Sequence, residues 1–190
     1  RVVIAEDEAI IRLDLKETLQ EEGYDVVGET GRGDEAVDLV RRLAPDLAIL
    51  DIKMPGMDGL EAARAISAER GAAVLILTAF SQRDLIEQAR DAGALAYLVK
   101  PFQKSELIPA VEVALGRFAE MKALAEENSS LAEQLATRKL VDRAKGILMD
   151  KHGMAESEAF RFVQKSAMDT RASLASVARR VVDGELTPGG

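Results

Sequence analysis

Short apolar runs alternate with longer amphipathic stretches along the first 110 residues of the chain. Five of the runs have the length of strands, and they cover residues 2–5, 26–27, 47–50, 74–77 and 97–99. Each run is followed by a stretch in which apolar residues recur with helical spacing. Glycine or proline residues end the first four helical stretches, which is the expected position of such breakers. Five strand-then-helix units predict an α/β fold.

The regular alternation predicts a parallel sheet that is covered by helices on both faces. We expect the doubly wound, flavodoxin-like strand order 2-1-3-4-5, in which the carboxyl ends of the first, third and fifth strands lie at or near one crevice. This domain is predicted to span residues 1–110. The chain begins with Arg1 directly before the first run and not with methionine, so we expect residues upstream of it.

Charged residues stand at the ends of three of the predicted strands. Glu6 and Asp7 follow the first run, Asp51 follows the third, and Lys100 follows the fifth. Functional groups of an open parallel sheet gather beyond the carboxyl ends of its strands, so these side chains are expected to converge. Three carboxylates at one place repel one another unless protons or a cation offset their charge. Mg²⁺, which prefers oxygen ligands, fits such a site.

The same residue types suit phosphoryl transfer, which depends mainly on positioning and on neutralising charge. Asp51 is the candidate nucleophile and would form an acyl phosphate. Lys100 would contact one phosphoryl oxygen, and the hydroxyl group of Thr78, which follows the fourth run, would contact another.

Composition narrows the chemistry further. The 190 residues, of which 47% are hydrophobic, suffice for one ordinary domain and a smaller one. The sequence has no cysteine and a single histidine, His152, which excludes disulfides, thiolate metal sites and histidine clusters. No apolar stretch approaches the roughly 20 residues of a membrane span, and no signal peptide is recognisable. We therefore expect a cytoplasmic protein that has no membrane partner.

Beyond residue 104 the strand-like runs stop, and the pattern becomes helical. No proline occurs between Pro109 and Met149, so one long helix or two abutting helices could cover this region. Residues at steps of three and four form what we call the heptad stripe: Leu115, Phe118, Met121, Leu124, Asn128, Leu131 and Leu135. The stripe permits a coiled coil in a helical linker over residues 111–130, and hence a homodimer on activation. The alternative is a helix that packs on its own domain.

The last third of the chain, residues 131–184, is predicted to be a small three-helix domain with a tail over residues 185–190. In the stretch 156–170, helical spacing groups a set of apolar residues on one face: Ala159, Phe160, Val163, Ala167 and Met168. We expect Phe160 and Phe162 to be core residues. On this interpretation, no aromatic side chain is free to stack on a nucleic-acid base.

Charge is distributed unevenly between the two parts. Residues 1–110 carry 13 basic and 21 acidic side chains, a net charge of −8, whereas residues 137–182 carry 10 basic and 5 acidic, a net charge of +5. A basic face is usually a solvated one, so charge alone does not identify a nucleic-acid partner.

The strand-end residues, together with the segments around them, resemble the receiver domain of two-component response regulators over residues 1 to about 110. The resemblance rests on Glu6-Asp7, on Asp51 with the following segment 54–59 (Met-Pro-Gly-Met-Asp-Gly), on Thr78-Ala79, and on segment 97–102 (Tyr-Leu-Val-Lys-Pro-Phe). It implies that Asp51 accepts phosphate from a sensor histidine kinase. It also implies a Mg²⁺ site and a switch, formed by these groups: Glu6, Asp7, Asp51 and the Lys53 backbone carbonyl for the ion, and Thr78 and Tyr97 for the switch.

Two further implications follow from the receiver resemblance. The peptide bond between Lys100 and Pro101 is expected to be cis, which the energetics of X-Pro bonds permits. The chain is not expected to be an enzyme, beyond phosphorylating itself from small donors and dephosphorylating itself.

The segment Arg143-Ala144-Lys145-Gly146-Ile147-Leu148-Met149 and later motifs resemble the ANTAR domain, an RNA-binding module of transcription antiterminators, over residues 124 to about 183. This implies binding to RNA hairpins in nascent transcripts, which prevents a terminator from forming. Basic side chains would contact phosphates, and unstacked loop bases would give specificity. The candidate contacts are Lys145, Arg143, Lys139, Lys165, Arg171 and Gly146. A DNA-binding regulator and a protein-docking or dimerisation module remain the alternatives.

Overall fold

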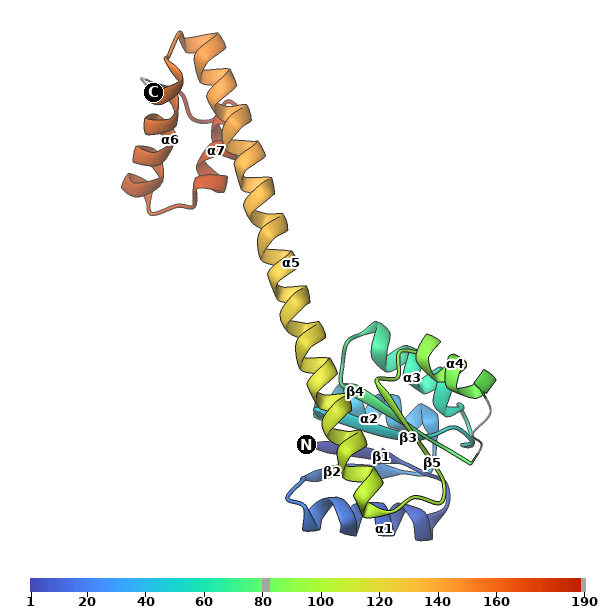
Figure 1. The fold of residues 1–190 in the computed structure, drawn as a ribbon. Coiled ribbons are helices and arrows are strands. Elements are labelled where there is room, and N and C mark those ends of the chain that lie inside the picture. The colour runs from blue at the N-terminus through green and yellow to red at the C-terminus, as the bar shows by residue number, and fades with distance from the viewer. Residues whose placement is uncertain (80–82, 189–190) are drawn as a thin grey trace. The chain divides into compact units, whose positions relative to one another are not determined.

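The computed structural model describes residues 1–79 and 83–188, and its chain divides into two compact units, Arg1–Lys122 and Ala123–Gly190 (Figure 1). Helix α5 (Lys104–His152) contributes residues to both units. The first unit holds a five-stranded sheet and the helices that cover it. The second unit holds the end of α5 and two shorter helices.

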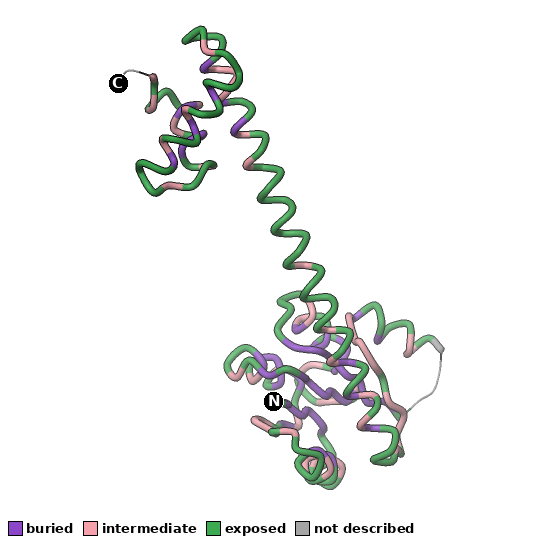
Figure 2. Tube along the Cα trace, turned by 60° about the vertical axis from the view of Figure 1, so that its left-hand side comes forward, coloured by how far each residue is buried: buried purple, intermediate pink, exposed green. Residues whose placement is uncertain are grey.

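The sheet of the first unit is parallel throughout and has the strand order β2-β1-β3-β4-β5. Its strands are β1 (Val2–Ala5), β2 (Val26–Thr30), β3 (Leu47–Asp51), β4 (Ala73–Thr78) and β5 (Ala96–Val99). Each strand contains one of the five apolar runs, so the predicted α/β class and strand order are confirmed. Residues of β1, β3 and β4 are almost completely buried, as expected for central strands covered on both faces (Figure 2).

Alternate residues of the central strands point to opposite sides of the sheet and enter two separate cores. Val3 of β1 belongs to the core that includes residues of helices α2 (Gly33–Leu43), α3 (Gly59–Ala68) and α4 (Arg83–Asp91). Ile4 belongs to the core that includes residues of α5 and of α1 (Ala9–Glu21). Two helices therefore cover one face of the sheet and three cover the other.

Helix α5 is one continuous helix through the region where the sequence left one or two helices open. The first residues of the heptad stripe, Leu115 and Phe118, pack against the core of the first unit. The next apolar members of the stripe are more than half exposed: Met121, Leu124, Leu131 and Leu135. The stripe therefore begins as a packing surface of the receiver-like unit and continues as an exposed apolar row.

The second unit is a three-helix structure made of the end of α5, α6 (Glu156–Thr170) and α7 (Leu174–Val182). Alanine and branched aliphatic side chains fill its core: Val141, Ala144, Leu148, Ala159, Val163, Ala167, Val177, Ala178 and Val181. Ser173 begins α7 as an N-cap, because its hydroxyl oxygen accepts a hydrogen bond of 3.1 Å from the backbone amide of Ser176. The predicted long helix followed by a small three-helix domain is thus confirmed.

The prediction that Phe160 is a core residue is wrong. Its side chain is 42% exposed, and Met168, placed on the same face by the sequence argument, is 74% exposed. The buried row of α6 consists instead of Ala159, Val163 and Ala167, whose spacing of four residues keeps them on one side of the helix. Phe162 lies at the edge of this row and is partly buried against the core.

None of the helices in the described part of the chain combines the length and the apolar character that a membrane crossing requires.

Candidate functional site

An acidic cluster lies at the carboxyl edge of the sheet. Strands β1 and β3 are neighbours, with Ala5 beside Leu50, so Glu6 and Asp51 lie side by side where the two strands end. One carboxylate oxygen from each of Glu6, Asp7 and Asp51 lies within 4.8 Å of the other two. Glu6 and Asp51 are buried, whereas Asp7 is exposed. The structure therefore brings together the three acidic residues that the sequence singled out.

Lys100 completes the cluster from the end of β5. Its ammonium group lies 2.7 Å from Oε2 of Glu6 and 2.8 Å from Oδ1 of Asp51. The side chain of Lys100 is only 13% exposed, so both ion pairs are shielded from bulk water. The peptide bond between Lys100 and Pro101 is cis, as predicted.

The electrostatics of the cluster reflect three neighbouring carboxylates, two of which, Glu6 and Asp51, pair with one ammonium group. Burial raises the pKa of Glu6, and the nearby charge of Asp51 adds to this rise, while Lys100 opposes it. Burial of the Lys100 ammonium group works against its charged form, but hydrogen bonds to Asp51 and Glu6 outweigh this effect and raise the pKa of Lys100. An excess of negative charge with oxygen donors is the chemistry that a hard divalent cation such as Mg²⁺ matches.

Backbone groups orient the carboxylates. The amide of Lys53 donates a hydrogen bond of 3.0 Å to Oδ2 of Asp51, and the amide of Glu8 donates one of 3.2 Å to Oε1 of Glu6. Together with Lys100, the Lys53 amide thus contacts both oxygens of Asp51. The backbone of Lys53 lies beside the cluster, where the predicted carbonyl ligand would be needed.

Two glycines hold the loop after Asp51 close to neighbouring backbone. A Cβ atom at Gly59 would lie 1.9 Å from the carbonyl oxygen of Asp51, and one at Gly33 would lie 2.1 Å from that of Met57. Both positions exclude any side chain, because backbone atoms cannot move aside at such distances. Asp58 begins α3 within this loop, and its Oδ1 accepts a hydrogen bond of 2.8 Å from the amide of Glu61. These two contacts are tertiary features that the sequence did not reveal.

The two predicted switch residues differ in exposure. Thr78 ends β4, is buried, and pairs in register with Val99 of β5. Its carbonyl oxygen accepts a hydrogen bond of 2.7 Å from the amide of Lys100, which ties it to the acidic cluster. Tyr97 lies on β5, and its side chain is 45% exposed.

In the second unit, the first candidate RNA contact is already engaged within the protein. The ammonium group of Lys145 lies 2.9 Å from Oδ1 of Asp142 and 2.9 Å from Oε1 of Glu156, and its side chain is 18% exposed. The pair with Glu156 links α5 to the start of α6. A phosphate group would therefore have to compete with two carboxylates for Lys145.

Other candidate contacts are open to solvent. Lys139, Arg143 and Gly146 follow one another at steps of four and three, so they share one face of α5. Lys139 and Arg143 are exposed, and a Cβ atom at Gly146 would meet nothing within 4 Å. Lys165 on α6 and Arg171 at the end of α6 are exposed as well.

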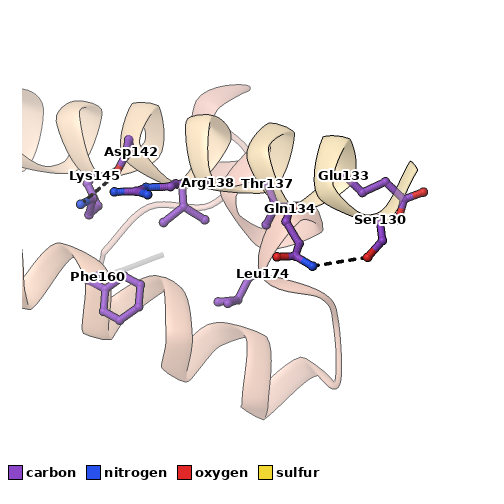
Figure 3. Close-up of a pocket in the computed structure, with 10 residues that line it drawn as sticks. Ser130, Glu133, Gln134, Thr137, Arg138, Asp142, Lys145, Phe160 and Leu174 are labelled. Carbon is purple, nitrogen blue, oxygen red and sulfur yellow. Dashed lines mark hydrogen bonds and ion pairs between the residues drawn. The ribbon is translucent and has the colours of Figure 1, made fainter. Parts of the chain in front are cut away.

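The second unit also contains a groove that sequence reasoning missed. It has a volume of about 570 Å³ and is lined by Ser130, Glu133, Gln134, Thr137, Arg138, Val141, Asp142, Lys145, Phe160 and Leu174 (Figure 3). We call it the Phe160 groove. In Figure 3, Phe160 and Leu174 lie opposite the polar side chains of α5. The spacing of Ala159, Val163 and Ala167 by four residues was the one signal in the sequence that Phe160 is displaced from the core.

The fold, the acidic cluster and the family comparison indicate the same class of protein. Residues 2–112 match the response regulator receiver domain, and residues 129–182 match the ANTAR domain. The chain belongs to the response regulators, with a receiver domain followed by an ANTAR domain.

Among individual proteins, the chain is similar to the transcriptional regulatory protein PdtaR of Mycobacterium tuberculosis. The two are 57% identical over 188 residues, which cover 99% of this chain and 92% of PdtaR. The chemotaxis protein CheY of Thermotoga maritima is 38% identical over 112 residues, which cover 58% of this chain and 93% of CheY.

Solved structures resemble the first unit. The signal receiver domain of NarL from M. tuberculosis is 33% identical, with a TM-score of 0.59, and the match covers 61% of this chain and 95% of NarL's. CheY of Borrelia burgdorferi, solved in a complex with CheX, BeF₃ and Mg²⁺, is 26% identical, with a TM-score of 0.55. That match covers 58% of this chain and 84% of the solved one.

Proposed function

We propose that this response regulator is controlled by phosphorylation of Asp51, with a sensor histidine kinase in the cytoplasm as the donor. One observation carries the proposal: the ammonium group of Lys100 lies 2.8 Å from Asp51 within a cluster of three carboxylates. Phosphoryl transfer requires a positioned nucleophile and compensation of charge on the phosphoryl oxygens. The acidic cluster supports both requirements. The Lys53 amide and Lys100 orient the Asp51 carboxylate, and the positive charge of Lys100 would offset charge on a phosphoryl oxygen.

The carboxylates of Glu6, Asp7 and Asp51, with the backbone carbonyl of Lys53, would hold Mg²⁺. When bound, the ion offsets the negative charge of the carboxylates and of the incoming phosphoryl group. The donor set supports this assignment, because it consists of hard oxygen ligands at the edge of a partly open site. The related CheY that was solved with BeF₃ and Mg²⁺ supports it independently.

The reaction that we propose is a single displacement at phosphorus. A carboxylate oxygen of Asp51 attacks the phosphorus atom of the kinase phosphohistidine, and a P–O bond forms as the P–N bond breaks. The electron pair of the broken bond returns to the imidazole nitrogen, and Asp51 becomes an acyl phosphate. Lys100 exchanges its contact with the Asp51 carboxylate for one with a phosphoryl oxygen, and the hydroxyl group of Thr78 donates to another.

Incubation of the full chain with acetyl phosphate, with and without Mg²⁺, tests this proposal. Intact-protein mass spectrometry should detect one added phosphoryl group with Mg²⁺ and none after chelation. Asp51→Asn should abolish the uptake. Asp58→Asn is the matched control in the same loop, and it should retain the uptake, because asparagine also serves as a helix N-cap. Equal labelling of wild type and Asp51→Asn would contradict the proposal.

Thr78 and Tyr97 would transmit the structural effect of phosphorylation at Asp51. Movement of the Thr78 hydroxyl group toward the phosphoryl group would leave space beside β5. The side chain of Tyr97 would then move into this space and become less exposed. Tyr24→Phe leaves Tyr97 as the only tyrosine, since the sequence contains two. Tyrosine fluorescence quenching by iodide in this variant should therefore fall on phosphorylation, and unchanged quenching would remove Tyr97 from the switch.

For the output, we propose that the second unit binds RNA hairpins in nascent transcripts and acts as a transcription antiterminator. The match to the ANTAR domain supports this function, and the exposed row of Lys139 and Arg143 beside Gly146 provides a basic surface for it. Lys145, Lys165 and Arg171 complete the proposed contact set. A titration against a structured RNA hairpin and a DNA duplex of matched sequence, at several salt concentrations, distinguishes RNA recognition from charge alone. Equal affinity for both would favour a DNA-binding or docking role.

A specific observation favours dimerisation as a second function of α5. Four apolar side chains of the heptad stripe, Met121, Leu124, Leu131 and Leu135, are each more than half exposed. Their spacing suits knobs-into-holes packing with the same helix of a second copy, with Asn128 as the polar register residue. Sedimentation of the phosphorylated chain should give a dimer, and Leu131→Lys should give a monomer.

A further inference from the structure

We propose that the Phe160 groove takes an unpaired base of the bound RNA and that the ring of Phe160 stacks on it. The inference rests on the RNA-binding function proposed above. It adds a binding site and two residues, Phe160 and Arg138, that the sequence did not indicate.

The floor of the groove is apolar and accessible. Phe160 is 42% exposed and Leu174 is 36% exposed, and the largely buried Val141 lies beside them. An aromatic ring that remains so open in a folded domain loses the hydrophobic stabilisation that burial would give it. The volume of about 570 Å³ falls within the range of roughly 300–1,000 Å³ in which proteins bind small organic groups.

The facing wall of the groove is polar. Ser130, Gln134 and Thr137 of α5 contribute hydroxyl and amide groups, and the amide nitrogen of Gln134 donates a hydrogen bond of 3.3 Å to Ser130 (Figure 3). These groups both donate and accept hydrogen bonds. A nucleobase matches this arrangement, since it has an apolar face for stacking and a polar edge for hydrogen bonds.

The charges of the groove favour a ligand whose uncharged base lies inside and whose phosphate lies at the rim. They disfavour a ligand that is anionic throughout. Glu133 and Asp142 line the groove and would repel an anion that lay deep inside it. The ammonium group of Lys145 is held by two carboxylates. Arg138 is exposed, and although its charge interacts with that of Asp142, it forms no hydrogen bond or salt bridge with any residue in the described part of the chain, so its guanidinium group can contact a phosphate at the rim.

The same wall argues against a second copy of the heptad stripe as the occupant. An apolar helix face in the groove would remove Ser130, Glu133 and Gln134 from water without giving them new partners, which is unfavourable. A base satisfies these groups, whereas an apolar helix does not.

The test uses the full chain and a pool of RNA hairpins that share one stem and carry a randomised loop, with the blunt stem duplex as reference RNA. Phe160→Leu should weaken hairpin binding by about fivefold to a hundredfold, the effect of losing one base–aromatic stack. Its affinity for the stem duplex should remain unchanged. Phe160→Tyr should retain wild-type affinity, and Met168→Ala serves as the control for an exposed apolar side chain on the same helix.

A second measurement reports stacking directly. Hairpins from the enriched pool, with 2-aminopurine at single loop positions, should show quenching at one position with wild type and none there with Phe160→Leu. If wild type binds no hairpin, the proposed RNA-binding function fails, and this inference fails with it. If wild type binds hairpins and Phe160→Leu binds them equally well, only this inference fails. An equal loss of affinity for hairpin and stem, or a change in oligomeric state with Phe160→Leu, would also overturn it.

Discussion

The ammonium group of Lys100 donates a hydrogen bond of 2.7 Å to Oε2 of Glu6, although 94 positions separate these residues in the sequence. The bond crosses the carboxyl edge of the sheet from the end of β5 to the end of β1, with β3 and β4 between them. Glu6 is fully buried, so its charge depends on this partner. The pair therefore links the stability of the receiver domain to the acidic cluster in which we place phosphorylation.

Lys100→Met should destabilise the receiver domain in the absence of Mg²⁺. Removal of one partner from a buried ion pair leaves the other charge uncompensated and costs about 3 kcal/mol. Urea unfolding at neutral pH measures this loss. The double variant Lys100→Met with Glu6→Gln should recover much of it, and a double variant as unstable as the single one would show that the pair does not determine stability.

The loss in Lys100→Met should also depend on pH. Burial already raises the pKa of Glu6 above its ordinary value, and removal of Lys100 takes away a group that lowers it. Protonated Glu6 is uncharged and tolerates burial, so the variant should be most stable below the unfolded-state pKa of Glu6. Its stability should fall as the pH rises through the raised pKa of the folded state. A variant whose deficit grows as the pH is lowered would contradict this assignment.

Gly59→Ala should destabilise the receiver domain by at least about 2 kcal/mol, because the new methyl group would overlap the backbone carbonyl of Asp51. The matched control is Gly116→Ala in α5, where a Cβ atom meets nothing within 4 Å. This control should gain about 0.5–1 kcal/mol from its higher helix propensity. Thermal unfolding of both variants measures the difference, and similar melting temperatures would disprove the close approach at Gly59.

Gly146→Ala should separate stability from RNA binding. The position lies inside α5 with open space around it, so alanine should raise stability by about 0.5–1 kcal/mol. Glycine at this position would let the RNA backbone come close to α5, and the methyl group of alanine would block that approach, so hairpin affinity should fall. Unchanged affinity in a more stable protein would remove Gly146 from the contact surface.

Arg143 and Lys145 should respond differently to substitution by alanine. Arg143 is exposed, so Arg143→Ala should reduce the slope of log affinity against log salt by roughly 0.7 to 0.9, the contribution of one phosphate contact, with no change in melting temperature. Lys145→Ala removes the ion pair between α5 and α6, so it should lower the melting temperature as well. Salt-dependent titrations and thermal scans of both proteins check this contrast, and identical behaviour would contradict it.

The receiver fold and its acidic cluster could be predicted because their signals are local and repeated. Strands β1 and β3 are nearly continuous apolar runs that end in Glu6 and Asp51, and the topology of a parallel sheet brings such ends together. The approach of Gly59 to Asp51 could not be predicted, because the tertiary path of the loop decides it.

The surface of the second unit was harder to predict, for a physical reason. Helical spacing groups Phe160 with the apolar residues of α6 and predicts it in the core, but α6 packs through Ala159, Val163 and Ala167 and leaves the ring 42% exposed. The sequence predicts Lys145 as an RNA contact, but in the structure its ammonium group pairs with the carboxylates of Asp142 and Glu156. The exposure of Phe160 depends on which face of α6 is buried, and the engagement of Lys145 depends on an ion pair between α5 and α6. A local sequence pattern determines neither.

The identity of the phosphorylated group is the most direct test of the central claim. Borohydride reduces an acyl phosphate to an alcohol, so treatment of the phosphorylated full chain converts a phosphorylated aspartate to homoserine. Peptide mass spectrometry should find homoserine at Asp51 alone, and only in samples phosphorylated in the presence of Mg²⁺. Conversion at Asp7 or Asp58 with Asp51 unchanged would contradict the account.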